Sequence, residues 1–308
     1  MPKISVIIPV YNKEKYVKET LQSVLNQDFN DFEVVILDDG STDKSLDIIQ
    51  QFSSSKIRII RQENQGVAIA RNTGVAAANA EIVAFLDADD LWLPNHLAEI
   101  DKLSQDFPDA GFYATAYKLK FNGHQYTVSF PFQDKYLQLK PYYRYDKGQA
   151  LFYISNFAIK KDIFMAEKGF KTGIDAEDTE FFIRIGQKYA LAYSKTTTMI
   201  HLNEAENSLF NQYRLERKIA LLDFFKQTEQ NDADLKTYLD MHRFTWTMEA
   251  LINHNEPLAR KLKQEIDTKN LNWKQKFLIK LPAFALRQLK NIQRKLQHTG
   301  IFWSAFSK

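Results

Sequence analysis

The acidic segment Asp87-Ala88-Asp89-Asp90 is the part of this sequence best suited to chemistry. It follows directly on the apolar run IVAFL at residues 82–86. Carboxylates packed this closely repel one another and lose hydration unless a cation lies among them. Mg²⁺ and Mn²⁺ prefer oxygen ligands and often share them with the phosphates of a substrate. The segment therefore predicts a divalent metal site, with a solvated acidic turn that caps the next helix as an equally weighted alternative.

Two acidic pairs elsewhere in the chain have both a structural and a chemical interpretation. Asp38-Asp39 follows the apolar run at 32–37, where one carboxylate can cap the next helix and the other can accept hydrogen bonds from a base or a ribose. Glu177-Asp178 precedes a predicted helix at 179–187, where an acidic pair is electrostatically favourable. A carboxylate there could equally act as a general base. Neither pair is decisive by itself.

The elements that must position these groups alternate along the first hundred residues. Apolar strands are predicted at 4–8, 32–37, 57–60 and 82–86, with helices at 14–26, from 41, at 66–80 and from 94. Apolar strands separated by helices predict a mainly parallel sheet covered on both faces. Ligands of such sheets bind at the carboxyl ends of the strands. The polar clusters at 9–12, 38–43 and 87–90 each follow a strand, so we expect them at one edge.

The rest of the chain is less regular. We predict strands at 112–121 and 126–130, a long aromatic-rich loop at 130–145, helices at 159–167 and 179–187, a strand at 190–200, and mostly helix beyond 206. His201 closes the last of these strands, a position where a histidine is more often structural. The fold class is therefore α/β, a mainly parallel sheet flanked by helices, with a mostly helical C-terminal extension.

Composition limits the class of protein. The 308 residues contain no cysteine, so disulfides and thiolate catalysis are excluded. No run of about 20 apolar residues occurs, so no transmembrane helix is expected. The opening MPKISVIIPV looks like a strand rather than a signal peptide. We therefore expect a cytoplasmic protein, peripheral at the inner face of the membrane if its tail binds lipid.

That tail, residues 269–308, has a charge of its own. The first 267 residues carry a net charge of −6 and the last 41 carry +9. An apolar stripe recurs at helical spacing, with aromatic residues around it: Leu278, Leu281, Ala285, Leu289, Ile292 and Leu296, then Trp273, Phe277, Phe284, Phe302 and Trp303. A basic amphipathic helix of this kind suits an anionic membrane surface, although the stripe could instead pack on the protein or on another subunit. No recognition module for nucleic acid accompanies the charge, so no nucleic-acid partner is expected.

Four segments, in order, carry a family resemblance. They are SVIIPVYNKEKYV at 5–17, VVILDDGSTD at 34–43, ENQGVAIARNTG at 63–74 and IVAFLDADD at 82–90. This pattern resembles the family 2 glycosyltransferases, which have the GT-A fold. The match covers roughly residues 3 to 100 and continues more weakly to about 210. It implies an inverting enzyme that transfers a sugar from a nucleotide diphosphate donor, usually a UDP-sugar, to a hydroxyl of a glycan or lipid-linked acceptor in polysaccharide or glycoconjugate biosynthesis.

The resemblance also implies a role for each motif residue. The nucleotide base would be held by Pro9, Tyr11 and Asp39, with Arg71 near the base or diphosphate and Asp87 at the ribose. Asp89 would ligate the cation, Mn²⁺ or Mg²⁺, and His201 would ligate it too or contact the diphosphate. Asp178 would be the general base, in the pair with Glu177.

The resemblance further suggests a division of the chain. Residues 1–205 would form the GT-A domain, with a nucleotide-sugar half at 1–109 and an acceptor half at 110–205, followed by a helical region at 206–308. Two departures from the family pattern concern the acceptor. Lys168-Gly169-Phe170-Lys171 replaces a Gly-Gly-Phe-Asp-like segment, and the Gln-x-x-Arg-Trp motif of processive synthases is missing, which favours transfer of single sugars.

Competing classes fare less well. A nucleotidyltransferase needs a glycine-rich loop near residue 10, and a dinucleotide-dependent oxidoreductase needs G-x-G-x-x-G after the first strand; the sequence contains neither. The main alternative is a non-catalytic protein of the same fold that binds sugar nucleotides or acts as a scaffold.

Overall fold

The first half of the chain alternates strands and helices because its apolar runs are short and separated by amphipathic segments. The computed structural model describes residues 1–121, 123–146, 148, 150–202 and 212–298. The strands are β1 (Ile4–Val10), β2 (Phe32–Asp38), β3 (Ile57–Arg61) and β4 (Ile82–Phe85). The helices between and after them are α1 (Val17–Leu25), α2 (Ser45–Gln50), α3 (Val67–Ala77) and α4 (His96–Asp106). These four strands are parallel, in the order β3-β2-β1-β4.

The second half of the sheet mixes directions. Its strands are β5 (Leu91–Trp92), β6 (Phe112–Phe121), β7 (His124–Thr127), β8 (Tyr136–Leu139), β9 (Phe157–Lys160) and β10 (Leu191–Leu202). The order continues from β4 as β9-β6-β10-β5, with β7 beside β6 and β8 beside β10. β10 runs parallel to β6, whereas β9 is antiparallel to both β4 and β6. The predicted α/β fold with a mostly parallel sheet is confirmed.

Three strands were not predicted from the sequence. The shortest, β5, lies between the acidic segment and the helix predicted from 94. β8 lies inside the segment 130–145, for which the sequence pattern predicts a loop. β9 occupies the start of a predicted helix at 159–167, and only α5 (Lys161–Ala166) is helical there. The four-residue run FAIK is too short for its periodicity to separate helix from strand. Its burial between β4 and β6 decides in favour of a strand.

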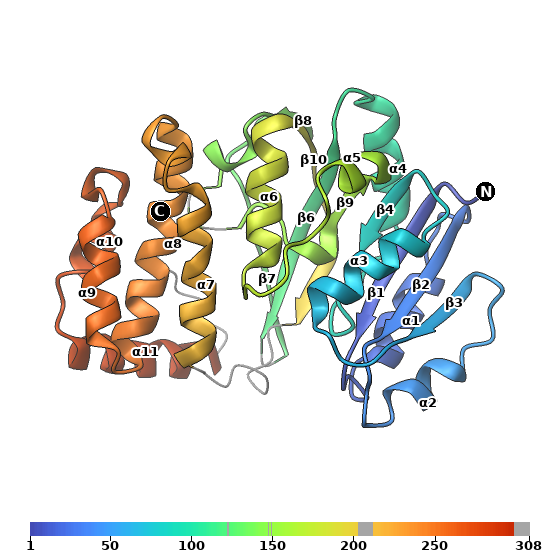
Figure 1. Cartoon of the computed structure of the whole chain (residues 1–308), viewed down its shortest axis with the longest axis horizontal. Coiled ribbons are helices and arrows are strands. Elements are labelled where there is room, and N and C mark those ends of the chain that lie inside the picture. Colours follow the sequence, from blue (N-terminus) through green and yellow to red (C-terminus); the bar gives the residue numbers. More distant parts are fainter. Residues whose placement is uncertain (122, 147, 149, 203–211, 299–308) are drawn as a thin grey trace.

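Helices cover both faces of the sheet (Figure 1). One apolar core contains side chains of α1, α2 and α4 with residues of β1, β2 and β4. The other contains side chains of α3, α5 and α6 (Glu177–Lys188), and it extends without interruption into the C-terminal helices. Those helices are α7 (Gln212–Phe225), α8 (Ala233–Ile252), α9 (Glu256–Glu265), α10 (Trp273–Leu278) and α11 (Ala283–His298). None of the described helices is both long enough and apolar enough to cross a membrane.

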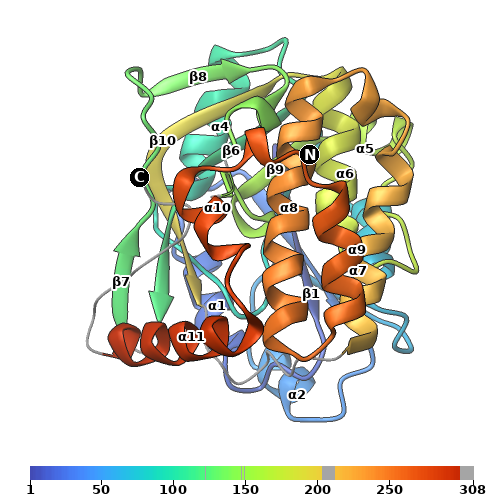
Figure 2. The same cartoon turned by 90° about the vertical axis from the view of Figure 1, so that its left-hand side faces the viewer.

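The C-terminal basic segment does not form one continuous helix, because Pro282 separates α10 from α11. Part of the predicted stripe packs inward. Leu278 is buried against Met241 and Phe244 of α8, as is Leu286, which the prediction did not include. Leu281 and Leu289 are partly buried beside them. Ile292 of the stripe is instead 52% exposed. Figure 2 shows α11 lying crosswise to the upright α8, beside its lower end. Phe302 and Trp303 lie outside the described residues.

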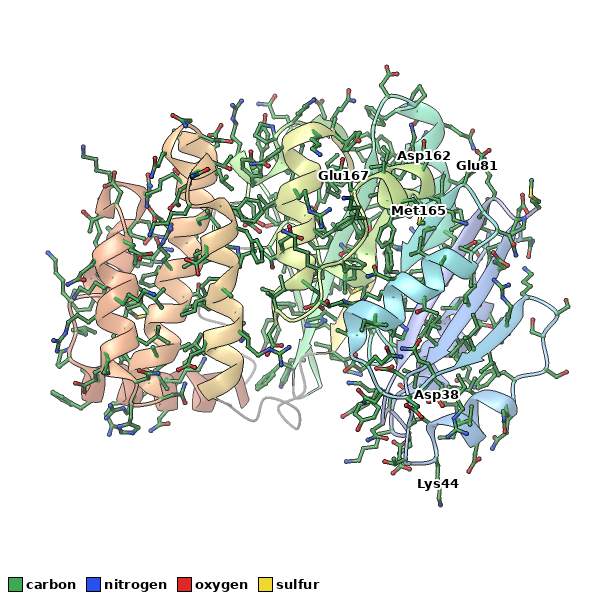
Figure 3. The ribbon with its side chains drawn as sticks, in the orientation of Figure 1. Asp38, Lys44, Glu81, Asp162, Met165 and Glu167 are labelled. Atoms are coloured by element: carbon green, nitrogen blue, oxygen red, sulfur yellow. The ribbon has the colours of Figure 1, made fainter. Side chains whose placement is uncertain are left out.

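The two ends of the sheet differ in what they carry. Figure 3 shows Asp38 and Lys44 at one end, whereas Glu81 and Asp162 lie at the opposite end. Asp38 is the last residue of β2, and Glu81 directly precedes β4. The polar segments that follow β1, β2 and β4 are therefore gathered at the end that Asp38 marks, as expected for parallel strands.

Candidate active site

The acidic segment after β4 forms a tight turn that is fixed from two sides. The Thr20 hydroxyl of α1 donates to the carbonyl oxygens of Ala88 and Asp90, at 3.0 and 2.9 Å. The buried Asp90 Oδ1 accepts hydrogen bonds from His201 Nδ1 at 2.9 Å and from the Leu202 amide at 3.0 Å. Asp90 therefore has a structural role. It holds the end of β10, and with it His201, against the turn that contains Asp87 and Asp89.

Arg71 ties three elements together at this edge. From α3, its guanidinium donates to Asp87 at 2.7 Å and to Glu177, the first residue of α6, at 2.9 Å. The side chain is buried above the ring of Phe170, 5.6 Å from its centroid. Burial lowers the pKa of Arg71, but the negative charges of Asp87 and Glu177 raise it by a larger amount. The net shift of the pKa is upward, so the guanidinium of Arg71 keeps its positive charge. Its Nε is buried and makes no hydrogen bond within the described residues.

Asp89 lies on the other side of the turn and pairs with Lys13. The Lys13 ammonium contacts Asp89 Oδ2, and the Lys13 amide donates to the Ser45 hydroxyl at 2.7 Å. Burial and the charge of Asp87 raise the pKa of Asp89, and Lys13 offsets only part of this increase. Ionised Asp89 is therefore electrostatically unfavourable as it stands, and a positive charge beside it would be stabilised.

This donor set fits a divalent cation. His201 Nδ1 is bonded to Asp90, which is the arrangement that orients a histidine whose other ring nitrogen binds metal. Burial lowers the pKa of His201, but its bond to Asp90 and the charges of Asp87 and Asp89 raise it overall. Within the described residues, no three acidic or histidine side chains make a complete metal site. A cation held by Asp89 and His201 would need oxygens from a substrate phosphate or water, as Mg²⁺ and Mn²⁺ commonly have.

The predicted base-binding residues meet at the ends of β1 and β2. The Asp39 amide donates to the Val10 carbonyl at 2.8 Å, which places it beside the strand that carries Pro9. Pro9 is buried, whereas Tyr11 is 47% exposed. The Asp39 carboxylate already accepts three hydrogen bonds, from the Gln62 side chain at 2.7 Å and from the Gln65 and Gly66 amides at 3.0 and 2.9 Å. The turn before α3 therefore shares Asp39 with any base that binds there.

Asp38 has a structural role, but it is not the helix cap considered from the sequence, because α2 begins only at Ser45 and its N-cap residue Lys44 makes no side-chain capping bond. Its buried carboxylate accepts from the Ser41 amide at 3.1 Å and lies 3.2 Å from Arg61 Nε of β3. Asp38 thus stabilises the turn after β2 and ties it to β3, whereas the Asp39 carboxylate bonds to the turn at 62–66.

The two carboxylates at the start of α6 have different partners. Glu177 faces Arg71, and its pKa is raised by burial and by Asp178, with Arg71 acting in the opposite direction. Asp178 Oδ1 accepts from the Thr179 amide at 2.6 Å and more weakly from the Thr179 hydroxyl at 3.3 Å. Asp178 also lines a cavity of about 290 Å³. Of the pair, Asp178 is therefore the one that can meet a substrate.

Sequence reasoning missed three residues of this site. Asp90 belongs to the acidic segment but was given no separate role. Lys13 lies in the polar stretch after β1, where nothing in the spacing pairs it with Asp89. Tyr153 stacks on His201 with ring centroids 4.7 Å apart. The two residues are 48 positions apart in the sequence, so no local sequence pattern could predict this contact.

Comparison with known sequences places the first half of the chain in one family. Residues 5–166 match the family described as "Glycosyl transferase family 2". An uncharacterized glycosyltransferase of Nostoc sp. is 51% identical over 106 residues, which are 33% of this chain and 33% of the relative. The putative teichuronic acid biosynthesis glycosyltransferase TuaG of Bacillus subtilis is 43% identical over 99 residues, 31% of this chain and 39% of that protein. The matched region thus spans little more than a third of these relatives.

Solved structures resemble nearly the whole chain in fold. S. aureus TarS, residues 1–349 in complex with UDP-GlcNAc, superimposes with a TM-score of 0.66 at 19% identity, over 98% of this chain and 93% of that one. Mannosyltransferase PcManGT from Pyrobaculum calidifontis, in complex with GDP-Man and Mn²⁺, gives a TM-score of 0.59 at 20% identity, over 97% and 84%. At such identities the likeness concerns the fold alone.

Proposed function

This chain belongs to glycosyltransferase family 2, and on that premise we propose that it transfers single sugars, with inversion, from a UDP-sugar to a hydroxyl of a glycan or lipid-linked acceptor. The observation that carries the proposal is the edge of the sheet where Asp89 and His201 lie beside the Arg71–Asp87–Glu177 network, with Asp178 facing a cavity next to it. Cell-surface polysaccharide or glycoconjugate synthesis is the setting we propose.

The donor would bind along the carboxyl ends of β1, β2 and β4. Pro9, Tyr11 and Asp39 would hold the base, and Asp87 and Arg71 would contact the ribose and the diphosphate. The base would donate a hydrogen bond to the Asp39 carboxylate, which the Gln65 and Gly66 amides already orient. Similar folds that hold UDP-GlcNAc in one case, and GDP-Man with Mn²⁺ in another, support a donor of this class.

The chemistry is a single displacement at the anomeric carbon. A cation bound by Asp89 and His201 would neutralise the charge that develops on the leaving diphosphate. Asp178 accepts the proton of the acceptor hydroxyl while its oxygen bonds to the anomeric carbon. The bond from that carbon to the diphosphate oxygen breaks as the new one forms, so the nucleoside diphosphate departs and no sugar–enzyme bond is made. Glu177 positions Arg71 rather than the acceptor.

A thermal-shift screen tests the proposal. The melting temperature is measured with UDP, GDP and their sugars, with and without Mn²⁺. We expect a metal-dependent rise with a uridine compound in the native chain and none in Asp89→Ala. An absence of stabilisation by any nucleotide diphosphate with Mn²⁺ or Mg²⁺ present would refute donor binding. Binding without any hydrolysis or transfer would instead identify the non-catalytic alternative.

The basic C-terminal segment supports a second part of the proposal, contact with an anionic membrane. Although Leu278, Leu281 and Leu289 of the stripe pack against the α8 side of their core, three aromatic side chains remain exposed. Trp273, Phe277 and Phe284 are 74%, 59% and 68% exposed. Trp273 and Phe277 are four residues apart on α10 and so share a face. Exposed Lys276 and Lys280 are close to them in sequence. Exposed aromatic residues beside lysines are typical of helices that lie in the membrane interface.

Vesicle binding tests this contact. Trp273, Phe277 and Phe284 are changed together to serine, and partition onto phosphatidylglycerol–phosphatidylcholine vesicles is measured by co-sedimentation. We expect a loss of at least ~10-fold, since burying one such side chain contributes about 1.5–3 kcal/mol. A double variant of Ile59 and Met165, which are exposed apolar residues of β3 and α5, is the control. Unchanged binding of the aromatic variant would show that these side chains meet a protein instead.

A further inference from the structure

The cavity beside Asp178 is built from two parts of the chain that are distant in sequence. Asp178, Thr179 and Phe182 of α6 form one wall. Residues of α8 form the opposite wall, including Tyr238, His242 and Thr245. The segment between β8 and β9 closes the remaining sides. Its volume of about 290 Å³ is at the small end of ligand sites, which are roughly 300–1,000 Å³.

This cavity adjoins the metal side of the active site through Tyr153. The Tyr153 ring lines the cavity and also stacks on His201, with centroids 4.7 Å apart and planes 17° from parallel. Burial raises the pKa of Tyr153, and the charges of Asp90 and Asp178 raise it by smaller amounts. Asp178, which also lines the cavity, is therefore close to Tyr153. A molecule in the cavity would therefore contact the proposed base directly and would be separated from His201 by the Tyr153 ring.

The chemistry of the walls selects a class of ligand. Aromatic rings provide flat apolar surfaces: Tyr142, Phe152, Tyr153, Phe182 and Tyr238. Asp146 and Asp178 provide carboxylate oxygens, which accept hydrogen bonds from hydroxyl groups. The Tyr142 side chain is buried and its hydroxyl lies close to that of Tyr238, so these two wall hydroxyls can bond to each other or to a ligand in the cavity. A sugar ring combines apolar C–H faces with a rim of hydroxyl donors and matches these surfaces.

The wall formed by α8 is fixed to the sheet domain. The Tyr143 hydroxyl donates to Asp232, the N-cap of α8, at 2.7 Å, and Arg144 Nε donates to Asp234 at 2.7 Å. The helix also shares its apolar core with α6. The position of α8 across from Asp178 is therefore set by direct contacts with the turn that carries Tyr142. Every residue of this wall lies beyond the 5–166 region that the family match covers.

We propose that this cavity holds the acceptor as a single uncharged sugar ring, and that α8 selects it through His242 and Thr245. The assignment rests on the proposed glycosyl transfer, because Asp178 must deprotonate one hydroxyl of that ring. Burial, with a smaller effect of Arg243, lowers the pKa of His242 to about 4, so its imidazole is neutral and can both donate and accept. Carboxylates facing the ring disfavour acceptors that carry a carboxylate or phosphate on it.

The test blocks the cavity from its exposed side. Thr245→Trp adds bulk at the mouth of the cavity, and Gln264→Trp, at an exposed position of α9, is the matched control. The probes are methyl glycosides of neutral hexoses and N-acetylhexosamines, followed by saturation-transfer NMR and by nucleotide release from a UDP-sugar with Mn²⁺. We expect at least one of them to give saturation transfer and to stimulate release in the native chain and in the control. Thr245→Trp should abolish both signals, whereas the affinity for the UDP-sugar, measured separately by calorimetry, should stay unchanged.

A second variant keeps the test independent of added bulk. Tyr142→Phe removes one hydroxyl from the cavity wall and keeps the buried ring. Because that hydroxyl lies beside the one of Tyr238, the melting temperature of the variant is measured to check that it folds. The KM of the methyl glycoside should rise about 5- to 10-fold, the value of one hydrogen bond, with the donor KM unchanged. The proposal is overturned if no neutral glycoside gives saturation transfer, if Thr245→Trp leaves the signals intact, or if methyl uronosides act equally well. Absence of donor binding in the native chain would be a failure of the proposed function instead.

Discussion

The two sides of the active site are built by different means. The donor side is the parallel sheet β3-β2-β1-β4, where each functional residue follows a strand and the chain returns through a helix. The acceptor side is assembled from a mixed sheet, the loops around Tyr142 and Tyr153, and a helix nearly 100 residues further on. The donor side serves a leaving group common to a whole family. Under the proposed function, the acceptor side would bind the substrate particular to this chain, and one of its walls is α8, which lies outside the sheet.

This difference predicts that the two sides can be disabled separately. Arg71 links the two sides through Asp87 on the donor side and Glu177 on the acceptor side. Asp90 with His201, and the Asp87 amide with the Ser155 hydroxyl, are further links between them. Variants of the remaining residues should therefore affect either donor binding or acceptor use. The expected effects decrease from the general base to the ion pair of Asp89.

The largest effect is expected for the acceptor side. Asp178→Asn removes the proposed base but keeps a group that can accept from the Thr179 amide. We expect transfer to fall by roughly 10²- to 10⁴-fold, the contribution of general base catalysis. The Kd for the UDP-sugar, measured by calorimetry, should remain within a factor of about two. Full transfer activity in this variant would show that Asp178 is not the base. The prediction that acceptor use can be disabled without affecting donor binding would then lose its main acceptor-side residue.

Asp89→Ala should disable the donor side instead. Losing a metal ligand should reduce transfer by at least ~100-fold, since a metal contributes several kcal/mol to such a transition state. In contrast to Asp178→Asn, the metal-dependent part of donor binding should disappear as well. Asp106→Ala, which removes an exposed carboxylate at the end of α4, is the control. If donor affinity and its Mn²⁺ dependence survive in Asp89→Ala, the cation lies elsewhere.

The acceptor side should also make folding stability depend on pH. Burial raises the pKa of Asp146 from 3.8 to about 7, and its hydrogen bonds from the Leu151 and Gly148 amides only partly oppose this. The folded chain then binds a proton more tightly than the unfolded chain between about pH 4 and 7. Stability from this group is present at low pH and is lost as the pH rises towards 7. Each pH unit crossed in this window costs up to about 1.4 kcal/mol of folding free energy.

Asp146→Asn should flatten that dependence. The comparison is the free energy of unfolding in urea at pH 5 and pH 8, for the native chain, for Asp146→Asn and for Asp109→Asn, which removes an exposed carboxylate. The absolute stability of Asp146→Asn can fall, because one of its two backbone donors loses its acceptor. The diagnostic quantity is the difference between the two pH values. A slope that persists in Asp146→Asn, and equals that of Asp109→Asn, would contradict the assignment.

The same contrast explains what could be foreseen from the sequence. The four parallel strands, the edge that carries Asp39 and Asp87, and the position of Asp178 at a helix start all follow from local patterns. β9 could not be foreseen, since a four-residue apolar run is helix or strand according to its neighbours. The pairing of Asp90 with His201 joins residues 111 positions apart, and the cavity wall of α8 depends on packing that no single segment encodes.

The smallest effect concerns the ion pair of Lys13 with Asp89, and it tests the donor side alone. Both side chains are partly exposed, at 23% and 30%, and a pair of this kind is worth about 1 kcal/mol or less. The Lys13 ammonium and a divalent cation would compete for the same carboxylate oxygen. Lys13→Met should therefore lower the half-saturating Mn²⁺ concentration by up to about 5-fold, measured by electron paramagnetic resonance without donor.

Lys18→Met is the matched control, because it removes the same charge from an exposed position of α1. Its Mn²⁺ affinity should change much less, since an exposed charge is screened by solvent and salt. Acceptor use should be unaffected in both variants. Equal shifts in the two would mean that Lys13 acts only through net charge, and weaker Mn²⁺ binding in Lys13→Met would mean that the lysine supports the metal site rather than competing for Asp89.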